Sequence, residues 1–138
     1  MPGSVRLYLV RHADAAPGDP DELRPLTPHG REQARNLGAR LAAEGAAGAA
    51  VVTSPLLRAR ETAEEIARAL GTAPEPDERL APGATADAVR EISAERGGTV
   101  VAVGHQPDCS RVAAALTGGP EPPFPKAGVV AIDLDDRA

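Results

Sequence analysis

Aromatic side chains are nearly absent from this sequence of 138 residues, which contains one Phe, one Tyr and no Trp. A hydrophobic core must therefore be built from Ala, Val, Leu and Ile, although 42% of the residues are hydrophobic, as in ordinary globular proteins. The chain also lacks the rings on which nucleic-acid bases stack. Together with a formal net charge of −5, this argues against a general nucleic-acid-binding protein, although a local basic pocket remains compatible with the composition.

Cysteine and long apolar runs are equally scarce. Cys109 is the single cysteine, which excludes an internal disulfide and a cysteine-rich zinc site and suits a reducing compartment. The apolar run at residues 7–10 is too short for a secretory signal or a membrane span. We therefore expect a cytoplasmic protein without membrane association.

The length predicts one domain that spans residues 1–138. Apolar stretches of strand length alternate along it with amphipathic stretches of helix length. Strands are expected at residues 6–10, 49–53, 99–103 and 129–134, with a weak edge strand at 75–80, and helices at residues 28–43, 54–70, 85–96 and about 109–116. This alternation predicts an α/β fold, a three-layer α/β/α sandwich with a mostly parallel central sheet.

Three of the expected helices begin with a recognisable cap. Thr27 followed by Pro28 is typical of an N-cap and a first helical residue, and Ser54 followed by Pro55 repeats the signal. Thr85 is expected to cap the third helix. His29 falls in the first turn of an exposed helix and is expected to be a surface residue.

Positively charged and imidazole side chains follow three of the expected strands. Arg11 and His12 come directly after the first strand, Arg58 comes shortly after the second, and His105 comes after the strand at residues 99–103. The carboxyl ends of parallel strands meet at one edge of a sheet, where α/β proteins bind their ligands. Arg58 also lies in the first turn of its helix, which favours anions. The pattern predicts an anion site.

Four segments of the chain carry a family resemblance. They are "RHA" at residues 11–13, "RPLTPHGREQA" at 24–34, "TSPLLRARETA" at 53–63 and "VGHQP" at 103–107. Together they resemble the histidine phosphatase superfamily, also called phosphoglycerate mutase-like, and are most similar to its small bacterial phosphohistidine phosphatase branch. The superfamily usually has glycine after the histidine of the first segment, where this chain has Ala13, but the branch often accepts alanine. The resemblance implies a phosphoglycerate mutase-like fold.

The resemblance also implies roles for five residues. His12 corresponds to the nucleophile that takes the phosphoryl group, and Arg11, Arg58 and His105 correspond to the residues that hold it. Arg24, in the loop before the first helix, would complete or gate the pocket as a substrate-binding residue. Arginine suits this task because its planar guanidinium stays ionised and donates paired hydrogen bonds. We therefore expect no metal ion and no other cofactor, and no carboxylate cluster resembles a magnesium site.

An acid to protonate the leaving group is missing where many superfamily members have one. The corresponding loop reads "APGATA" at residues 81–86; Asp77, Glu78 and Asp87 flank it and Asp14 lies near the nucleophile, but none is assigned this role. An imidazole leaving group, with a pKa of about 6.5, has far less need of an acid than an alcohol, for which water at about 15.7 stands in. The chain is better equipped to cleave P–N than P–O bonds.

These patterns favour a protein phosphohistidine phosphatase that acts through a phosphorylated His12. Its partner would be a phosphohistidine-bearing protein or a small phosphorylated substrate. One alternative is a general phosphatase for phosphate monoesters, and another is a phosphate-binding module without turnover. A mutase is less favoured, because so short a chain has little material for a cap that excludes water.

Overall fold

The central element is a five-stranded sheet in the order β3-β2-β4-β1-β5, seen in a computed structural model that describes residues 4–135. The strands are β1 (Ser4–Arg11), β2 (Ala50–Thr53), β3 (Pro74–Pro76), β4 (Thr99–Gly104) and β5 (Val129–Asp135). The first four are parallel, and β5 runs antiparallel beside β1 at the edge. The predicted mostly parallel sheet is confirmed.

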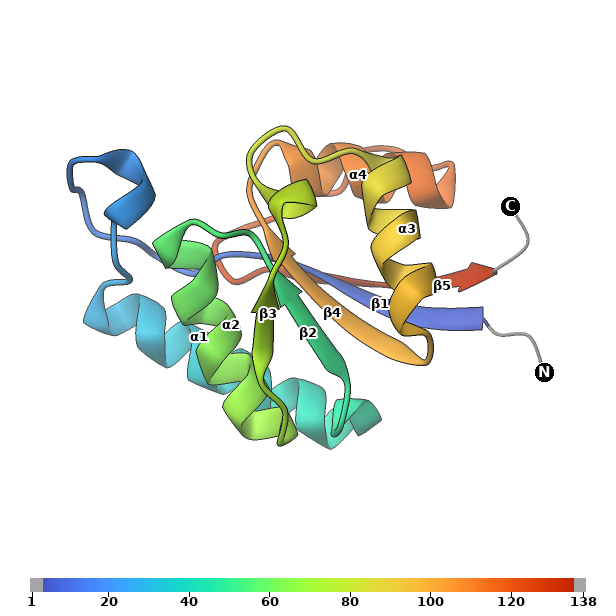
Figure 1. The fold of residues 1–138 in the computed structure, drawn as a ribbon, viewed down its shortest axis with the longest axis horizontal. Coiled ribbons are helices and arrows are strands. Elements are labelled where there is room, and N and C mark those ends of the chain that lie inside the picture. The colour runs from blue at the N-terminus through green and yellow to red at the C-terminus, as the bar shows by residue number, and fades with distance from the viewer. Residues whose placement is uncertain (1–3, 136–138) are drawn as a thin grey trace.

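Helices cover both faces of this sheet, as Figure 1 shows. α1 (Pro28–Leu41) and α2 (Leu57–Leu70) lie on one face, and α3 (Ala86–Arg96) and α4 (Asp108–Thr117) lie on the other. The predicted α/β/α sandwich is therefore confirmed as well. Within residues 4–135, none of the helices is long and apolar enough to cross a bilayer.

Alternation along the central strands divides the aliphatic core into two layers. In β1, Leu7 and Leu9 pack toward α3 and α4, whereas Tyr8 and Val10 pack toward α1 and α2. All four side chains are buried, because successive residues of a strand point to opposite faces and helices cover each face. The sheet is thus held rigidly from both sides.

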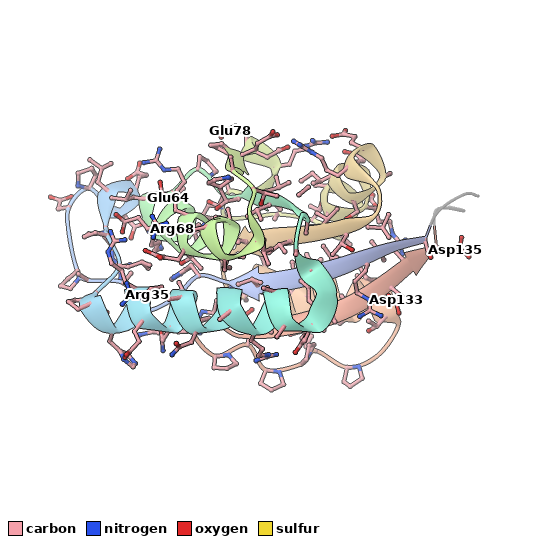
Figure 2. All side chains as sticks on the ribbon, turned by 90° about the horizontal axis from the view of Figure 1, so that it is seen from below. Arg35, Glu64, Arg68, Glu78, Asp133 and Asp135 are labelled. Carbon is pink, nitrogen blue, oxygen red and sulfur yellow. The ribbon has the colours of Figure 1, made fainter. Side chains whose placement is uncertain are left out.

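The parallel strands deliver their carboxyl ends to one end of the molecule. In Figure 1 this end faces the loop after β1, and the described chain begins and ends at the opposite side. Figure 2 shows the same separation, because Asp133 and Asp135 on β5 lie far from the loop that precedes α1. Side chains placed directly after β1, β2 and β4 therefore share one end of the sheet.

Two of the three predicted helix caps are observed. Thr27 Oγ1 accepts a hydrogen bond of 2.9 Å from Gly30 N, and Thr85 Oγ1 accepts one of 3.1 Å from Ala88 N. The prediction that Ser54 caps the next helix is wrong, because α2 begins three residues later, after Leu56. The Ser54 hydroxyl instead lies 2.7 Å from a ring nitrogen of His105.

The predicted edge strand at residues 75–80 is only partly correct. β3 ends at Pro76 and is followed by a short 3-10 helix, Glu78–Leu80. Asp77 causes the change of direction, because its side chain accepts a hydrogen bond of 2.9 Å from the Arg79 backbone N–H. The helix expected at residues 28–43 also ends slightly early. α1 ends at Leu41, and the chain continues as one wide helical turn that ends at Gly45, which has a φ of 99°.

The loop after β1 packs directly against the first turn of α1. Asp14 O accepts a hydrogen bond of 3.0 Å from Thr27 N, and a Cβ placed on Gly30 would lie 2.0 Å from the same oxygen. Only a residue without a side chain allows this approach. Gly30 therefore sets how closely the segment after β1 is held to the helix.

We predict that Gly30→Ala lowers the free energy of unfolding by about 1–3 kcal/mol, because the added methyl group forces the loop and the helix apart. Urea denaturation measures the effect. Gly119→Ala is the matched control, since its Cβ would meet its nearest atom, Thr117 Oγ1, at an ordinary 3.5 Å. Equal stability of the two variants would contradict the account of the close contact.

Candidate active site

Two histidines emerge side by side from the ends of paired strands. Arg11, the last residue of β1, pairs with Gly104, the last residue of β4, so that His12 and His105 leave the sheet together. His12 N donates a hydrogen bond of 3.0 Å to Gly104 O, which extends the pairing by one residue. The two rings have centroids 5.3 Å apart and planes inclined at 59°.

A backbone carbonyl sets the orientation and protonation of the His12 ring. Nδ1 lies 2.8 Å from Ala13 O, and because a carbonyl oxygen can only accept, Nδ1 carries the proton. Nε2 therefore keeps its lone pair, which is the form that a nucleophile requires. This is the kind of acceptor that the chemistry of a histidine nucleophile demands.

Thr62 of α2 holds the backbone N–H of Ala13, the residue whose carbonyl contacts His12. The fully buried Thr62 hydroxyl accepts a hydrogen bond of 3.0 Å from Ala13 N and donates one of 2.8 Å to Arg58 O. The threonine thus links the segment beside His12 to the first turn of α2. Sequence reasoning did not single out Thr62, although it lies within the segment "TSPLLRARETA".

The His105 ring is buried, with 4% of the residue exposed. Its Nε2 lies 2.7 Å from Ser54 Oγ. Its Nδ1 is also buried, and within the described part of the chain it has no hydrogen-bond partner. Nδ1 is therefore the ring nitrogen of His105 that the described residues leave without a partner.

Arg58 and Arg24 are joined by one carboxylate. Arg58, of which 8% is exposed, donates from Nη1 to Asp21 O at 2.9 Å and from Nη2 to Asp21 Oδ2 at 3.1 Å. Arg24 donates from Nη1 to Asp21 Oδ1 at 3.2 Å and from Nε to Ala16 O at 2.9 Å. These arginines hold the pKa of Asp21 below its usual range. Sequence reasoning missed Asp21, whose only signal is its position three residues before Arg24.

Arg11 is held from the opposite side of the site. Its Nη1 donates a hydrogen bond of 2.9 Å to the backbone oxygen of the buried Phe124. Its Nε is buried and finds no partner among residues 4–135. The segment that follows Phe124 is tied to the nucleophile, since Ala127 N donates to His12 O at 3.1 Å. Arg11 therefore brings a fixed charge with a spare donor next to His12.

Burial and positive charge keep both rings neutral. The pKa of His12 is lowered from 6.5 to about 4, mainly by burial and further by the charges of Arg58, Arg11 and Arg24, against the opposing effect of the Ala13 carbonyl. The pKa of His105 is lowered to about 4 by burial and by His12 and Arg58. Desolvation is thus the larger cause for His12, and the arginines add to it.

Asp14 and Asp77, two of the candidate acids, form hydrogen bonds and ion pairs with other residues. Asp14 accepts hydrogen bonds of 2.7 Å from both Lys126 Nζ and Thr27 Oγ1, and these contacts lower its pKa. Asp77 is paired with Arg79 at 2.8 Å, which lowers its pKa likewise. Both carboxylates are therefore ionised at neutral pH and carry no proton to donate. Glu78, on the outer surface in Figure 2, and Asp87 are exposed, as is His29.

Asp108 is a further acid that the sequence did not mark out. It begins α4, is 9% exposed, and accepts hydrogen bonds at Oδ2 from Gly83 N at 2.8 Å and from Ala84 N at 3.3 Å. The loop at residues 81–86 is thus anchored by a carboxylate from another element. The sequence within and beside the loop gives no sign of Asp108, which lies on the helix that faces it.

Comparison with known proteins gives three informative relatives. An uncharacterized protein of Picosynechococcus is 39% identical over 123 residues, which are 83% of this chain and 74% of the relative. The phosphohistidine phosphatase SixA of Escherichia coli is 28% identical over 140 residues, covering 96% of this chain and 87% of SixA. A structure of the protein histidine phosphatase SixA complexed with tungstate matches with a TM-score of 0.86 and 27% identity, covering 95% and 89% of the two chains.

The family model agrees with these relatives. Residues 7–82 match the model of the histidine phosphatase superfamily (branch 1), and this range contains most of β1 and all of α1, β2 and α2, with His12 and Arg58. The matching SixA structure extends the similarity over the remainder of the sheet, including the strand that presents His105. The chain belongs to the histidine phosphatase superfamily and has the fold of its phosphatases.

Proposed function

We propose that this protein is a phosphohistidine phosphatase that works through a phosphorylated His12. The observation that carries the proposal is the hydrogen bond from His12 Nδ1 to Ala13 O, which leaves the Nε2 lone pair available in a site lined with guanidinium groups. The similarity to SixA supports the substrate class. The proposed partner is a phosphohistidine-bearing protein or a small phosphorylated substrate, and the single cysteine supports a cytoplasmic location.

The proposed reaction has two steps that share one intermediate. In the first, His12 Nε2 forms a bond to phosphorus while the P–N bond of the substrate breaks, and the substrate ring, protonated at its other nitrogen, leaves as neutral imidazole with the electron pair. In the second, water attacks the same phosphorus, the bond to Nε2 breaks with its electron pair returning to the ring, and inorganic phosphate leaves with both protons of the water. His12 returns to its neutral form, in which Nδ1–H again donates to Ala13 O.

Arginine side chains supply the positive charge for both steps. Arg11 and Arg58 are proposed to bind the equatorial phosphoryl oxygens together with His105, and Arg24 to complete the pocket through Asp21. Fixed guanidinium groups can stabilise the charge that develops during phosphoryl transfer without a metal ion. Within residues 4–135, no three His, Cys, Asp or Glu side chains are grouped so that they would hold one. We therefore propose that the enzyme is metal-independent.

The leaving group explains why a P–N substrate suits this site. Asp14 and Asp77 are ionised, and the loop at residues 81–86 contributes no acid. The pKa of imidazole as a leaving group is roughly nine units below that of water, and this difference is larger than the usual ~10²–10⁴-fold gain from general acid catalysis can offset. A site without a protonated acid therefore acts on phosphohistidine far better than on phosphate monoesters.

A substrate panel tests the proposal. We predict that kcat/KM is higher for a phosphohistidine protein and for phosphoramidate than for sugar phosphates or nucleotides, with no loss in excess chelator. Incubation with labelled phosphohistidine protein should transfer the label to His12, and His12→Ala should abolish both transfer and turnover. Higher kcat/KM for monoesters, turnover by His12→Ala, or a loss in chelator restored only by added metal would each contradict the proposal.

We predict that Arg58→Ala lowers kcat by the amount expected for one lost transition-state donor, roughly 3–4 kcal/mol or a few hundredfold. Steady-state kinetics with phosphoramidate measure the loss. Arg60→Ala is the matched control, because Arg60 is exposed on the same helix two residues away. Similar activities of the two variants would show that Arg58 does not stabilise the transferring group.

The histidine pKa values predict an unusual pH profile. With the pKa of His12 at about 4, the nucleophile stays neutral between about pH 7 and 5, so kcat/KM should not fall there through its protonation, whereas a ring with a pKa of 6.5 would lose about 25-fold. Activity should fall as the pH drops below about 4. Turnover of phosphoramidate, corrected with His12→Ala for uncatalysed hydrolysis, and NMR titration of the His12 ring measure this. Titration near pH 6.5 would contradict it.

A further inference from the structure

We propose that Ser54 is a positioning residue that sets the tautomer of His105, so that Nδ1 carries the proton and donates it to a bound phosphoryl oxygen. The inference rests on the proposed function insofar as it gives His105 the role of phosphoryl donor. It assigns to Ser54 a task other than the helix cap that its place before Pro55 suggests.

The Ser54 hydroxyl has two contacts, which together determine where its proton lies. Ser54 is fully buried, and its Oγ accepts a hydrogen bond of 3.2 Å from Leu56 N. The same oxygen lies 2.7 Å from His105 Nε2. A serine hydroxyl has one proton to donate and two lone pairs to accept with, whereas a neutral imidazole donates from one nitrogen and accepts at the other.

One assignment of the protons satisfies the Ser54 hydroxyl and leaves the smallest number of buried polar groups without a partner. If His105 Nε2–H donated to Ser54 Oγ, the hydroxyl proton would need another acceptor, and among the described residues Oγ has no contact besides Leu56 N and His105 Nε2. Nδ1 would then also be a buried acceptor without a donor. If instead Ser54 O–H donates to Nε2, the hydroxyl is satisfied and Nδ1–H is the single unfilled donor. Buried polar groups strongly favour the satisfied arrangement.

The resulting pair of tautomers suits a phosphoryl group. His12 offers a lone pair at Nε2 and His105 offers a proton at Nδ1, on rings whose centroids are 5.3 Å apart. The first binds phosphorus and the second binds an equatorial oxygen. The opposite tautomer of His105 would present a lone pair to an anion, which repels it. Because His105 stays neutral at working pH, its tautomer, and not its charge, decides whether it can donate.

The backbone around Ser54 keeps this contact in place. Ser54 N donates a hydrogen bond of 2.9 Å to Val103 O, two residues before His105. The serine and the histidine are therefore tied to the same part of β4, and Thr53, the residue before Ser54, pairs with Val103 in the sheet. The hydroxyl reaches the ring from a fixed position, without the freedom of a surface loop.

NMR of the imidazole nitrogens tests the tautomer directly. We expect the wild-type protein to show His105 protonated at Nδ1, and Ser54→Ala to show an increased population protonated at Nε2. Ser93→Ala is the matched control, since Ser93 is an equally buried serine on α3, and it should leave the His105 signals unchanged. A wild-type spectrum with the proton on Nε2 overturns the proposal without any variant, as does an unchanged spectrum in Ser54→Ala.

Tungstate binding supplies a second readout that does not depend on the physiological substrate. Loss of one hydrogen bond to an anion should weaken tungstate binding and lower kcat for phosphoramidate by about 10- to 100-fold in Ser54→Ala, with Ser93→Ala matching the wild type. Equal tungstate affinity in Ser54→Ala and wild type overturns the inference. A protein that shows the expected tautomer and tungstate effects but hydrolyses no phosphohistidine retains this inference and loses the proposed function.

Discussion

The in-register pairing of β1 with β4 is the constraint on which the site depends. Arg11 lies opposite Gly104, so the next residue of each strand is a histidine, and His12 N continues the ladder to Gly104 O. The distance between the rings is therefore a property of the sheet. A shift of one residue in this register would exchange the two faces of β1 and separate the histidines at once, so the packing of the core and the placement of the site cannot vary independently.

Hydroxyl groups and a backbone carbonyl then orient the two histidines that the sheet brings together. Ala13 O orients His12, Thr62 accepts a hydrogen bond from Ala13 N, and Ser54 contacts His105. Thr62 and Ser54 flank the start of α2, the helix that also presents Arg58. The residues around the start of α2 thus contact the segments of both histidines and include Arg58. For this reason the helix does not begin with an ordinary serine cap. The prediction that Ser54 caps the helix fails because its hydroxyl contacts His105 instead.

The sequence predicts the layers and the main site positions because both follow from local patterns. The strands at residues 99–103 and 129–134 and the Thr27 and Thr85 caps are visible in short windows, and Arg11, His12 and His105 stand directly at strand ends. The contacts of Asp21 with Arg58, Thr62 with Ala13, and Asp108 with Gly83 join residues 37, 49 and 25 positions apart. Aspartate and threonine occur everywhere on protein surfaces, so nothing in their neighbourhood marks these three before the chain is folded.

The carboxylate shared by Arg24 and Arg58 has a consequence for the enzyme at rest. Two guanidinium groups held near each other repel, and Asp21 acts as a built-in counterion that offsets this repulsion. The exposed position of Asp21 means that water screens it more than it screens the buried Arg58. Under the proposed function, an arriving dianion meets a site whose charge is already partly balanced, and the contacts with Asp21 hold the two arginines in place before it binds.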